Sequence, residues 1–295
     1  MPNSIKLLAL LSLLITPVLS ADVPANIRSL YNSIRAKGQC SKILKGGFYS
    51  EEGDSQDFSY CGDHLASDGI VYLQGTGGSL ANMDINCSGY NYDPYGGQSW
   101  CDDGLDSLRW TRFDDIVARY QNGGPGLSPY IHSFITFGNF GTKKGYVPFD
   151  PQSVGIEPLS IMAVVCGDKL FYGVWGDGNE DDGPASVGEA SAILGRHCYG
   201  DTMDVFHSHL ENDVLYIAFT GHHAATGVHG ANWNATTFEE FQESLQAHGN
   251  RLISRIGHND GTLSLDTQEM GGLLSVLVSV QCILYYVLTS EIALQ

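Results

Sequence analysis

Two acidic residues at either end of a short acidic loop are the strongest candidates for chemistry in this sequence. Asp177 closes an apolar, strand-like run, and Glu189 follows the loop at the expected start of a helix. Two carboxylates that face one another across such a loop are the minimum apparatus for hydrolysing a glycosidic bond. Three further acidic residues lie between them, namely Glu180, Asp181 and Asp182.

The surroundings of the two acids suggest different roles for them. In glycoside hydrolysis one carboxylic acid protonates the departing oxygen, while a carboxylate on the other side of the sugar attacks or activates water. Like charges raise the pKa of a carboxyl group, so the acidic loop favours Asp177 as the general acid. Glu189 is expected in the first turn of a helix over residues 187–194, where the helix dipole favours an ionised base.

Calcium binding is the main chemical alternative for the same loop. Asp177, Asn179 and Asp181 have the spacing of an EF-hand loop, but Asp182 occupies the position where that loop needs glycine. An irregular calcium site and a solvated acidic turn therefore both stay open.

Other catalytic or metal-binding patterns are incomplete. The histidines at 207, 209, 222, 223 and 229 lack the cysteine or carboxylate spacing of a metal site, so we expect surface histidines and no bound metal. The chain contains no G-x-S-x-G motif of a serine hydrolase, and we expect no cofactor.

The N-terminus has the layout of a secretory signal peptide. Lys6 precedes an apolar run over residues 7–15, and small residues before Ala21 provide a cleavage site, so residues 1–20 are expected to be removed. The exported part contains six cysteines before the C-terminal tail, which predicts three disulfides of undetermined connectivity. They are Cys40, Cys61, Cys87, Cys101, Cys166 and Cys198.

The chain is strongly acidic. Its 33 acidic and 15 basic residues give a formal net charge of -18, which argues against nucleic acid or an anionic membrane as a partner. A cationic partner is favoured, although acidic residues that only keep an exported protein soluble would give the same balance.

The pattern along the chain predicts one α+β domain over residues 21–257, with a mainly antiparallel or barrel-like sheet and flanking helices. A hairpin is expected over residues 160–175, with its turn at Gly167 and Asp168. Further strands are expected over residues 69–73, 81–87, 130–138 and 213–219, and helices over 25–36, 108–120, 187–194 and 236–256. In the last helix Thr237 is the expected N-cap.

Residues 258–295 form a polar spacer and a hydrophobic tail. The order of small residues, spacer and apolar run is that of a GPI-attachment signal, while the length also suits a membrane-spanning helix. A mistranslated end of the gene is a third alternative. Asn234, Ala235 and Thr236 form an N-glycosylation motif; Asn86, Cys87 and Ser88 match it formally, but that cysteine is expected to be bridged.

Several long segments resemble the fungal chitosanases of glycoside hydrolase family 75. They include YLQGTGGSLANMDINC (72–87), the segment from FDPQSVGIEP to FYGVWGD (149–177), VGEAS (187–191) and DVLYIAF (213–219), and the resemblance runs from about Asn26 to Ile256. It implies endo-hydrolysis of the β-1,4 links of chitosan with inversion, no cofactor, and secretion. It also implies that Asp177 and Glu189 are the essential acids.

The resemblance gives the acidic charge a meaning, because chitosan is a chain of protonated glucosamines that an acidic groove would attract. We expect Asp102, Asp103, Asp181 and Asp182 to line that groove and Trp175 to offer a ring to a sugar, with Tyr92 and Trp100 as other candidates. The protein is expected to be a secreted monomer, anchored at the cell surface if the tail is an anchor. The alternative is a non-catalytic surface module that binds a cationic polysaccharide or calcium.

Overall fold

The computed structural model describes residues 21–257, apart from residues 52, 91, 97–99 and 102–108. The expected signal peptide and the hydrophobic tail lie outside the described residues. Within the described part of the chain, no helix has both the length and the apolar character needed to cross a bilayer.

Six strands of the domain pair with one another in a closed ring. Around the ring β8 pairs with β6, β6 with β9, β9 with β5, β5 with β10, β10 with β7, and β7 with β8. The bounds are β5 (Ala81–Asn86), β6 (Phe134–Asn139), β7 (Ile161–Cys166), β8 (Lys169–Asn179), β9 (Glu189–Ser191) and β10 (His209–Phe219). Such closure leaves no unpaired edge within the ring.

Shorter strands extend this ring on two sides. β4 (Ile70–Gln74), β3 (Phe58–Cys61) and β2 (Ile43–Phe48) follow one another outward from β10, and β1 (Ala21–Asp22) pairs with β8. The expectation of an α+β fold with a mainly antiparallel or barrel-like sheet is confirmed. Two pairings of the ring, β6 with β8 and β5 with β9, are nevertheless parallel.

The hairpin of β7 and β8 forms as the sequence predicts. Cys166 pairs with Lys169, so Gly167 and Asp168 make a two-residue turn. Gly167 has a positive φ of 59°, a backbone conformation that glycine adopts without the steric penalty of a side chain.

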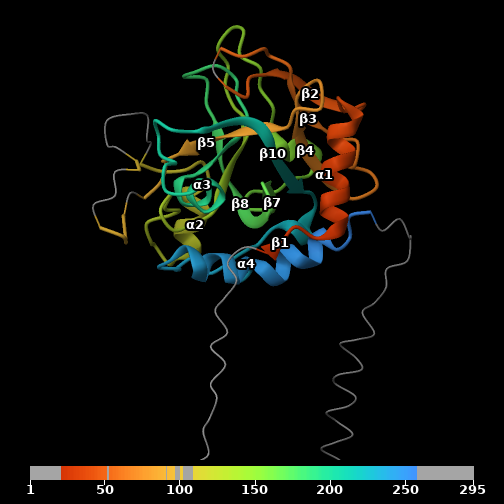
Figure 1. Cartoon of the computed structure of the whole chain (residues 1–295). Helices are drawn as coiled ribbons and strands as arrows, with labels where there is room; N and C mark the ends of the chain where they lie inside the picture. Colours follow the sequence, from red (N-terminus) through yellow and green to blue (C-terminus); the bar gives the residue numbers. More distant parts are fainter. Residues whose placement is uncertain (1–20, 52, 91, 97–99, 102–108, 258–295) are drawn as a thin grey trace, which may run out of the picture. The chain divides into compact units, whose positions relative to one another are not determined.

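The described chain also contains four α-helices, of which the third and fourth pack against strands of the ring. They are α1 (Ala25–Lys37), α2 (Asp114–Tyr120), α3 (Ala192–Tyr199) and α4 (Phe238–Ile253), together with the 3-10 turns η1 (Pro151–Val154) and η2 (His222–Ala224). α4 contacts β7 and β8 and runs below them in Figure 1. As expected, the Thr237 hydroxyl caps α4 by accepting a hydrogen bond from the backbone N–H of Glu240.

Two of the expected helices differ in the structure. The prediction of a helix over residues 187–194 is wrong, because residues 189–191 form strand β9 and α3 begins only at Ala192. The helix expected over residues 108–120 is shorter, since α2 begins at Asp114. In both cases the residues before the helix are held by contacts with distant parts of the chain.

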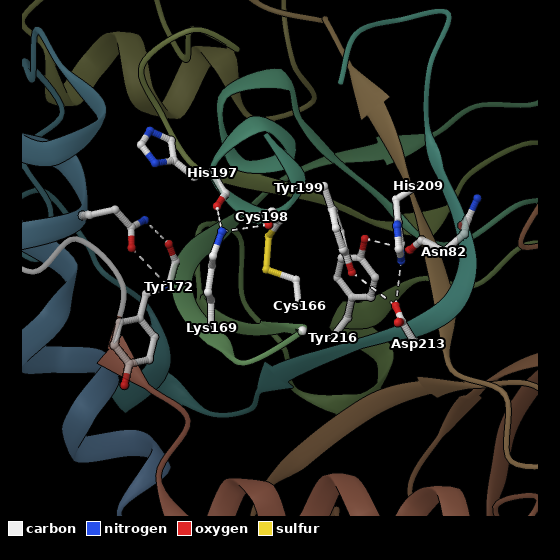
Figure 2. Close-up of a disulfide and its surroundings, with 12 residues drawn as sticks. Asn82, Cys166, Lys169, Tyr172, His197, Cys198, Tyr199, His209, Asp213 and Tyr216 are labelled. Carbon is white, nitrogen blue, oxygen red and sulfur yellow. Dashed lines mark hydrogen bonds and ion pairs between the residues drawn. A yellow bond between two sulfur atoms is a disulfide. The ribbon is translucent and has the colours of Figure 1, made fainter. Parts of the chain in front are cut away.

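The six cysteines that were expected to be bridged form three disulfides, Cys40–Cys61, Cys87–Cys101 and Cys166–Cys198. The last of these joins the end of β7 to the C-terminal turn of α3 (Figure 2). Beside it the Lys169 ammonium donates hydrogen bonds to the carbonyl groups of His197 and Cys198, which lie in the last turn of α3. The disulfide therefore fixes α3, and with it the short strand β9 that precedes the helix.

Replacing Cys166 and Cys198 together with alanine should lower the free energy of unfolding by about 3–4 kcal/mol, the loop-closure value for this sequence separation of 32 residues. Urea unfolding of the oxidised wild type and the variant measures the difference. A loss below about 1 kcal/mol would mean that α3 is held without the disulfide.

Candidate active site

The pairing of three neighbouring strands brings Asp177 and Glu189 to the same part of the ring. Thr136 on β6 pairs with Asp177 on β8 and also with Glu189 on β9. Paired residues of adjacent strands face the same side, so the two acids lie on one face of the ring with a single strand between them. Asp177, Thr136 and Glu189 all line one cleft of about 840 Å³.

A β-bulge turns Asp177 toward this cleft. Ile135 pairs with Trp175 and the next residue, Thr136, pairs with Asp177, so Gly176 is an extra residue in β8. Side chains two positions apart in a regular strand face the same side, and Trp175 is fully buried in the core. The bulge therefore separates the direction of Asp177 from that of Trp175.

Three hydrogen-bond donors surround the Asp177 carboxylate. Oδ1 accepts from the backbone N–H of Arg112 at 2.9 Å and of Gly178 at 3.0 Å, and Oδ2 accepts from Asn86 Nδ2 at 3.0 Å. Burial raises the pKa of Asp177 to about 6, and these donors oppose that rise because they favour the ionised form. Asp177 thus titrates slightly below neutral pH while held in one orientation.

The surroundings of Glu189 disfavour a negative charge more strongly than those of Asp177 do. Burial, together with repulsion from the nearby carboxylates of Asp177 and Asp84, raises the pKa of Glu189 to about 8. A hydrogen bond from the Thr136 side chain lowers the pKa, and Asp182 adds a smaller repulsion. Glu189 therefore keeps its proton at pH values where Asp177 has lost its own.

This order of titration reverses the roles suggested by the sequence. That assignment placed Glu189 in the first turn of a helix, where the dipole would favour the charged form. Glu189 instead lies in strand β9, three residues before α3 begins at Ala192. Desolvation and like charge then determine its pKa, and the surroundings suit Glu189 as a proton donor and Asp177 as a base.

Two side chains that the sequence did not mark as part of the site form a polar connection between the two acids. Asn86 Nδ2 donates to Thr136 Oγ1 at 2.7 Å as well as to Asp177, and the Thr136 hydroxyl bonds to Glu189. Asn86 and Thr136 are both buried. A shift of either side chain would therefore disturb both carboxyl groups.

Asp84 is a third carboxyl group at this site. It pairs with Glu189 across β5 and β9, so the two side chains face the same side. Burial raises the pKa of Asp84 to about 6, with Glu51 adding to the rise and the Ser208 and Asn82 side chains opposing it. The sequence contained a signal for Asp84, because polar residues at positions 82, 84 and 86 alternate with apolar ones and so share one face of the strand.

The cleft offers acidic and aromatic groups around the two acids. Glu180 and Asp182 line it, and Glu180 pairs with Arg112 at 2.7 Å. Trp110 also lines it and is 59% exposed, so its ring is open to a ligand. Trp110 was missed from the sequence because the segment reads as the start of a helix.

The substrate-binding residues expected from the sequence have different outcomes. Asp182 lines the cleft, but Asp181 lines a neighbouring cavity and accepts hydrogen bonds from the backbone N–H groups of Thr142 and Lys143. Trp175 is fully buried and donates its indole N–H to the Asp177 carbonyl, so it supports the acid and offers no face to a sugar. Asp102 and Asp103 lie outside the described residues.

The calcium alternative finds no support in the acidic loop. Asp177 and Asn179 are part of the extended strand β8, and Glu189 belongs to another strand. Among the residues that the structure describes, no group of three or more His, Cys, Asp or Glu side chains could hold a metal ion.

Comparison with known proteins identifies the family. Residues 83–255 match the family described as fungal chitosanase of glycosyl hydrolase group 75. The chain belongs to this family. It is a glycoside hydrolase, and its matched region includes Asp84, Asn86, Thr136, Asp177 and Glu189.

Individual relatives agree with this family. Endo-chitosanase B of Aspergillus oryzae (strain ATCC 42149 / RIB 40) is 38% identical over 245 residues, which cover 82% of this chain and 94% of the relative. An endo-chitosanase of Aspergillus fumigatus is 36% identical over 244 residues, with the same coverage of both chains. Endo-chitosanase C of Aspergillus oryzae is 29% identical over 204 residues, covering 66% of this chain and 44% of the relative.

Replacing Asp84 with asparagine should lower the pKa of Glu189, because the substitution removes a negative charge and keeps a polar side chain of similar size. The basic limb of the pH profile of kcat/KM should move to lower pH. Activity on soluble chitosan should fall roughly three- to tenfold at pH 8 and stay nearly unchanged near pH 5.

The matched control is Asp168→Asn, since Asp168 is fully exposed in the β7–β8 turn. Its profile should follow the wild type. A folded Asp84→Asn enzyme with an unshifted basic limb would show that Asp84 has no electrostatic influence on Glu189.

Proposed function

We propose that this chain is a secreted endo-chitosanase that hydrolyses the β-1,4 bonds of chitosan with inversion at the anomeric carbon. The single observation that carries the proposal is the position of Asp177 and Glu189 on strands separated only by β6. Inverting enzymes need about 6.5–9.5 Å between their carboxyl groups to admit a water molecule, whereas retaining enzymes have about 5–5.5 Å. With the Thr136 side chain on the intervening strand, the two carboxyl groups are set apart from each other, as inversion requires.

The two acids would act on opposite faces of one sugar. Glu189, protonated at working pH, donates its proton to the glycosidic oxygen as the bond to the anomeric carbon breaks. Asp177, ionised and oriented by Arg112, Gly178 and Asn86, accepts a proton from the attacking water. The new C–O bond forms on the face opposite the leaving group, so a β link yields an α product.

The charge of the cleft supports a cationic polymer as the substrate. Asp177, Glu180, Asp182 and Glu189 line it, and the one cation among its described lining residues, Arg112, is paired with Glu180. A cleft lined by charge of one sign concentrates ligands of the opposite sign. Relatives named endo-chitosanase agree with this choice. We propose Asp182 and Trp110 as substrate contacts, with Trp110 presenting its ring to a sugar.

The second candidate function is a module that binds a cationic polysaccharide without cleaving it. The acidic cleft alone would serve either role, but binding gives no reason for a buried, like-charged carboxyl pair bridged by Thr136 and Asn86. We propose that the enzyme acts outside the cell as a monomer, with anchoring at the cell surface as a further alternative.

Asp177→Asn and Glu189→Gln should each lower kcat on soluble chitosan by at least about 10³-fold, because each removes one half of the proton transfer. KM should change little, since both amides keep the shape of the site. Reducing-end release measures the rate, and proton NMR of the first products should show the α anomer for the wild type.

Asp168→Asn again serves as the control, because it removes one exposed carboxylate in the β7–β8 turn, at the opposite end of β8 from Asp177. Circular dichroism confirms that each variant is folded. Undiminished turnover by either amide variant, or β anomers as the first products, would contradict the mechanism. Saturable binding by the wild type without new reducing ends would instead support the binding module.

A further inference from the structure

A further cavity, distinct from the catalytic cleft and from the cavity lined by Asp181, has an aromatic wall. Its volume is about 290 Å³, and it shares no lining residue with the cleft. Tyr90 and Tyr92 line it with nearly parallel rings, 16° apart in orientation and 6.1 Å between centroids. Both side chains are about half exposed, at 44% and 54%. We call this cavity the tyrosine pocket; His132, Trp233, Asn234 and Thr236 also line it.

The tyrosine pocket is partly formed by an N-glycosylation motif. Asn234, Ala235 and Thr236 form this motif in the segment just before α4, and Asn234 and Thr236 are exposed. Motifs of this kind accept glycans in exported proteins, at surface positions. A sugar attached to Asn234 would therefore be tethered at the pocket from the outset.

The structure distinguishes this motif from the other one in the chain. Asn86 is only 5% exposed, donates hydrogen bonds to Thr136 and Asp177, and precedes Cys87, which is bonded to Cys101. A glycan on Asn86 would have to displace the catalytic base. Only Asn234 can carry a glycan without disturbing the fold.

We infer that Asn234 carries an N-linked glycan and that the tyrosine pocket holds its first sugar. Asn234 Nδ2 forms a bond to C1 of N-acetylglucosamine and loses one proton. The C1–O bond to a lipid diphosphate donor breaks, and the lipid diphosphate leaves. The step requires export, as the signal peptide predicts, and does not depend on the catalytic proposal.

The chemistry of the pocket fits a tethered N-acetylglucosamine. Pyranose rings present apolar C–H faces, which pack on aromatic rings such as those of Tyr90 and Tyr92. The Ser128 and Thr236 hydroxyl groups also line the pocket. They donate to the Tyr92 carbonyl and to Glu240 respectively, so they can meet the sugar as hydrogen-bond acceptors. Because the sugar is linked covalently, it occupies the pocket without the loss of translational freedom that free sugars pay on binding.

The first test is chemical and uses the full chain secreted from a yeast host. After endoglycosidase H, mass spectrometry of peptides should find one N-acetylhexosamine on the peptide with Asn234 and none on that with Asn86. Thr236→Ala should abolish the modification, and the matched Thr236→Ser should retain it. An unmodified Asn234 in the secreted wild type would overturn the inference.

The second test addresses the pocket. Protein trimmed to one sugar should melt about 2–4 °C above the unglycosylated Asn234→Gln variant, the shift expected for about 1 kcal/mol in a domain of this size. In a Tyr92→Ala background this difference should disappear. Equal melting temperatures with and without the sugar would overturn the pocket's role. Chitosan hydrolysis by Asn234→Gln should match the wild type, so the outcome is separate from that of the catalytic proposal.

Discussion

The proposed active site depends on the pairing of strand β6 with both β8 and β9 at a single residue. Thr136 fixes the register of Asp177 on one side and of Glu189 on the other, and the bulge at Gly176 directs Asp177 into the cleft. A slip of one residue in either pairing would turn a carboxyl group to the other face. Because the two acids lie on strands that flank β6, the spacing of the strands determines how far apart the acids are. Loops, whose shapes vary, would not hold the acids at a fixed spacing.

The buried position of Glu189 destabilises the folded protein as the pH rises. The folded pKa of Glu189 is about 8, well above the ordinary pKa of a glutamate in an unfolded chain, about 4.3. Between these values the folded protein holds a proton that the unfolded chain has released. The free energy of unfolding therefore falls as the pH rises through this window. The proposed proton donor therefore keeps its proton near neutral pH at the expense of stability.

Local patterns in the sequence were sufficient for some elements and insufficient for others. The β7–β8 hairpin and the Thr237 cap depend on neighbouring residues, and the acidic pair could be chosen from residue type and resemblance. β9 is different, because its three residues are extended only through pairing with β5 and β6. Locally VGEAS reads as a helix start. That error placed Glu189 beside a helix dipole and inverted the expected order in which the two acids titrate. Asn86 and Thr136 could not be connected before the parallel pairings were known.

The most direct test is a carbon-13 NMR titration of glutamate side-chain carboxyl groups in the wild type and in Asp177→Asn. Our account predicts one glutamate, absent from the spectrum of Glu189→Gln, that titrates at a pKa of about 8. In Asp177→Asn this pKa should fall, because the repelling carboxylate is gone. If every glutamate instead titrates near the ordinary value of about 4.3, Glu189 cannot be the proton donor described here.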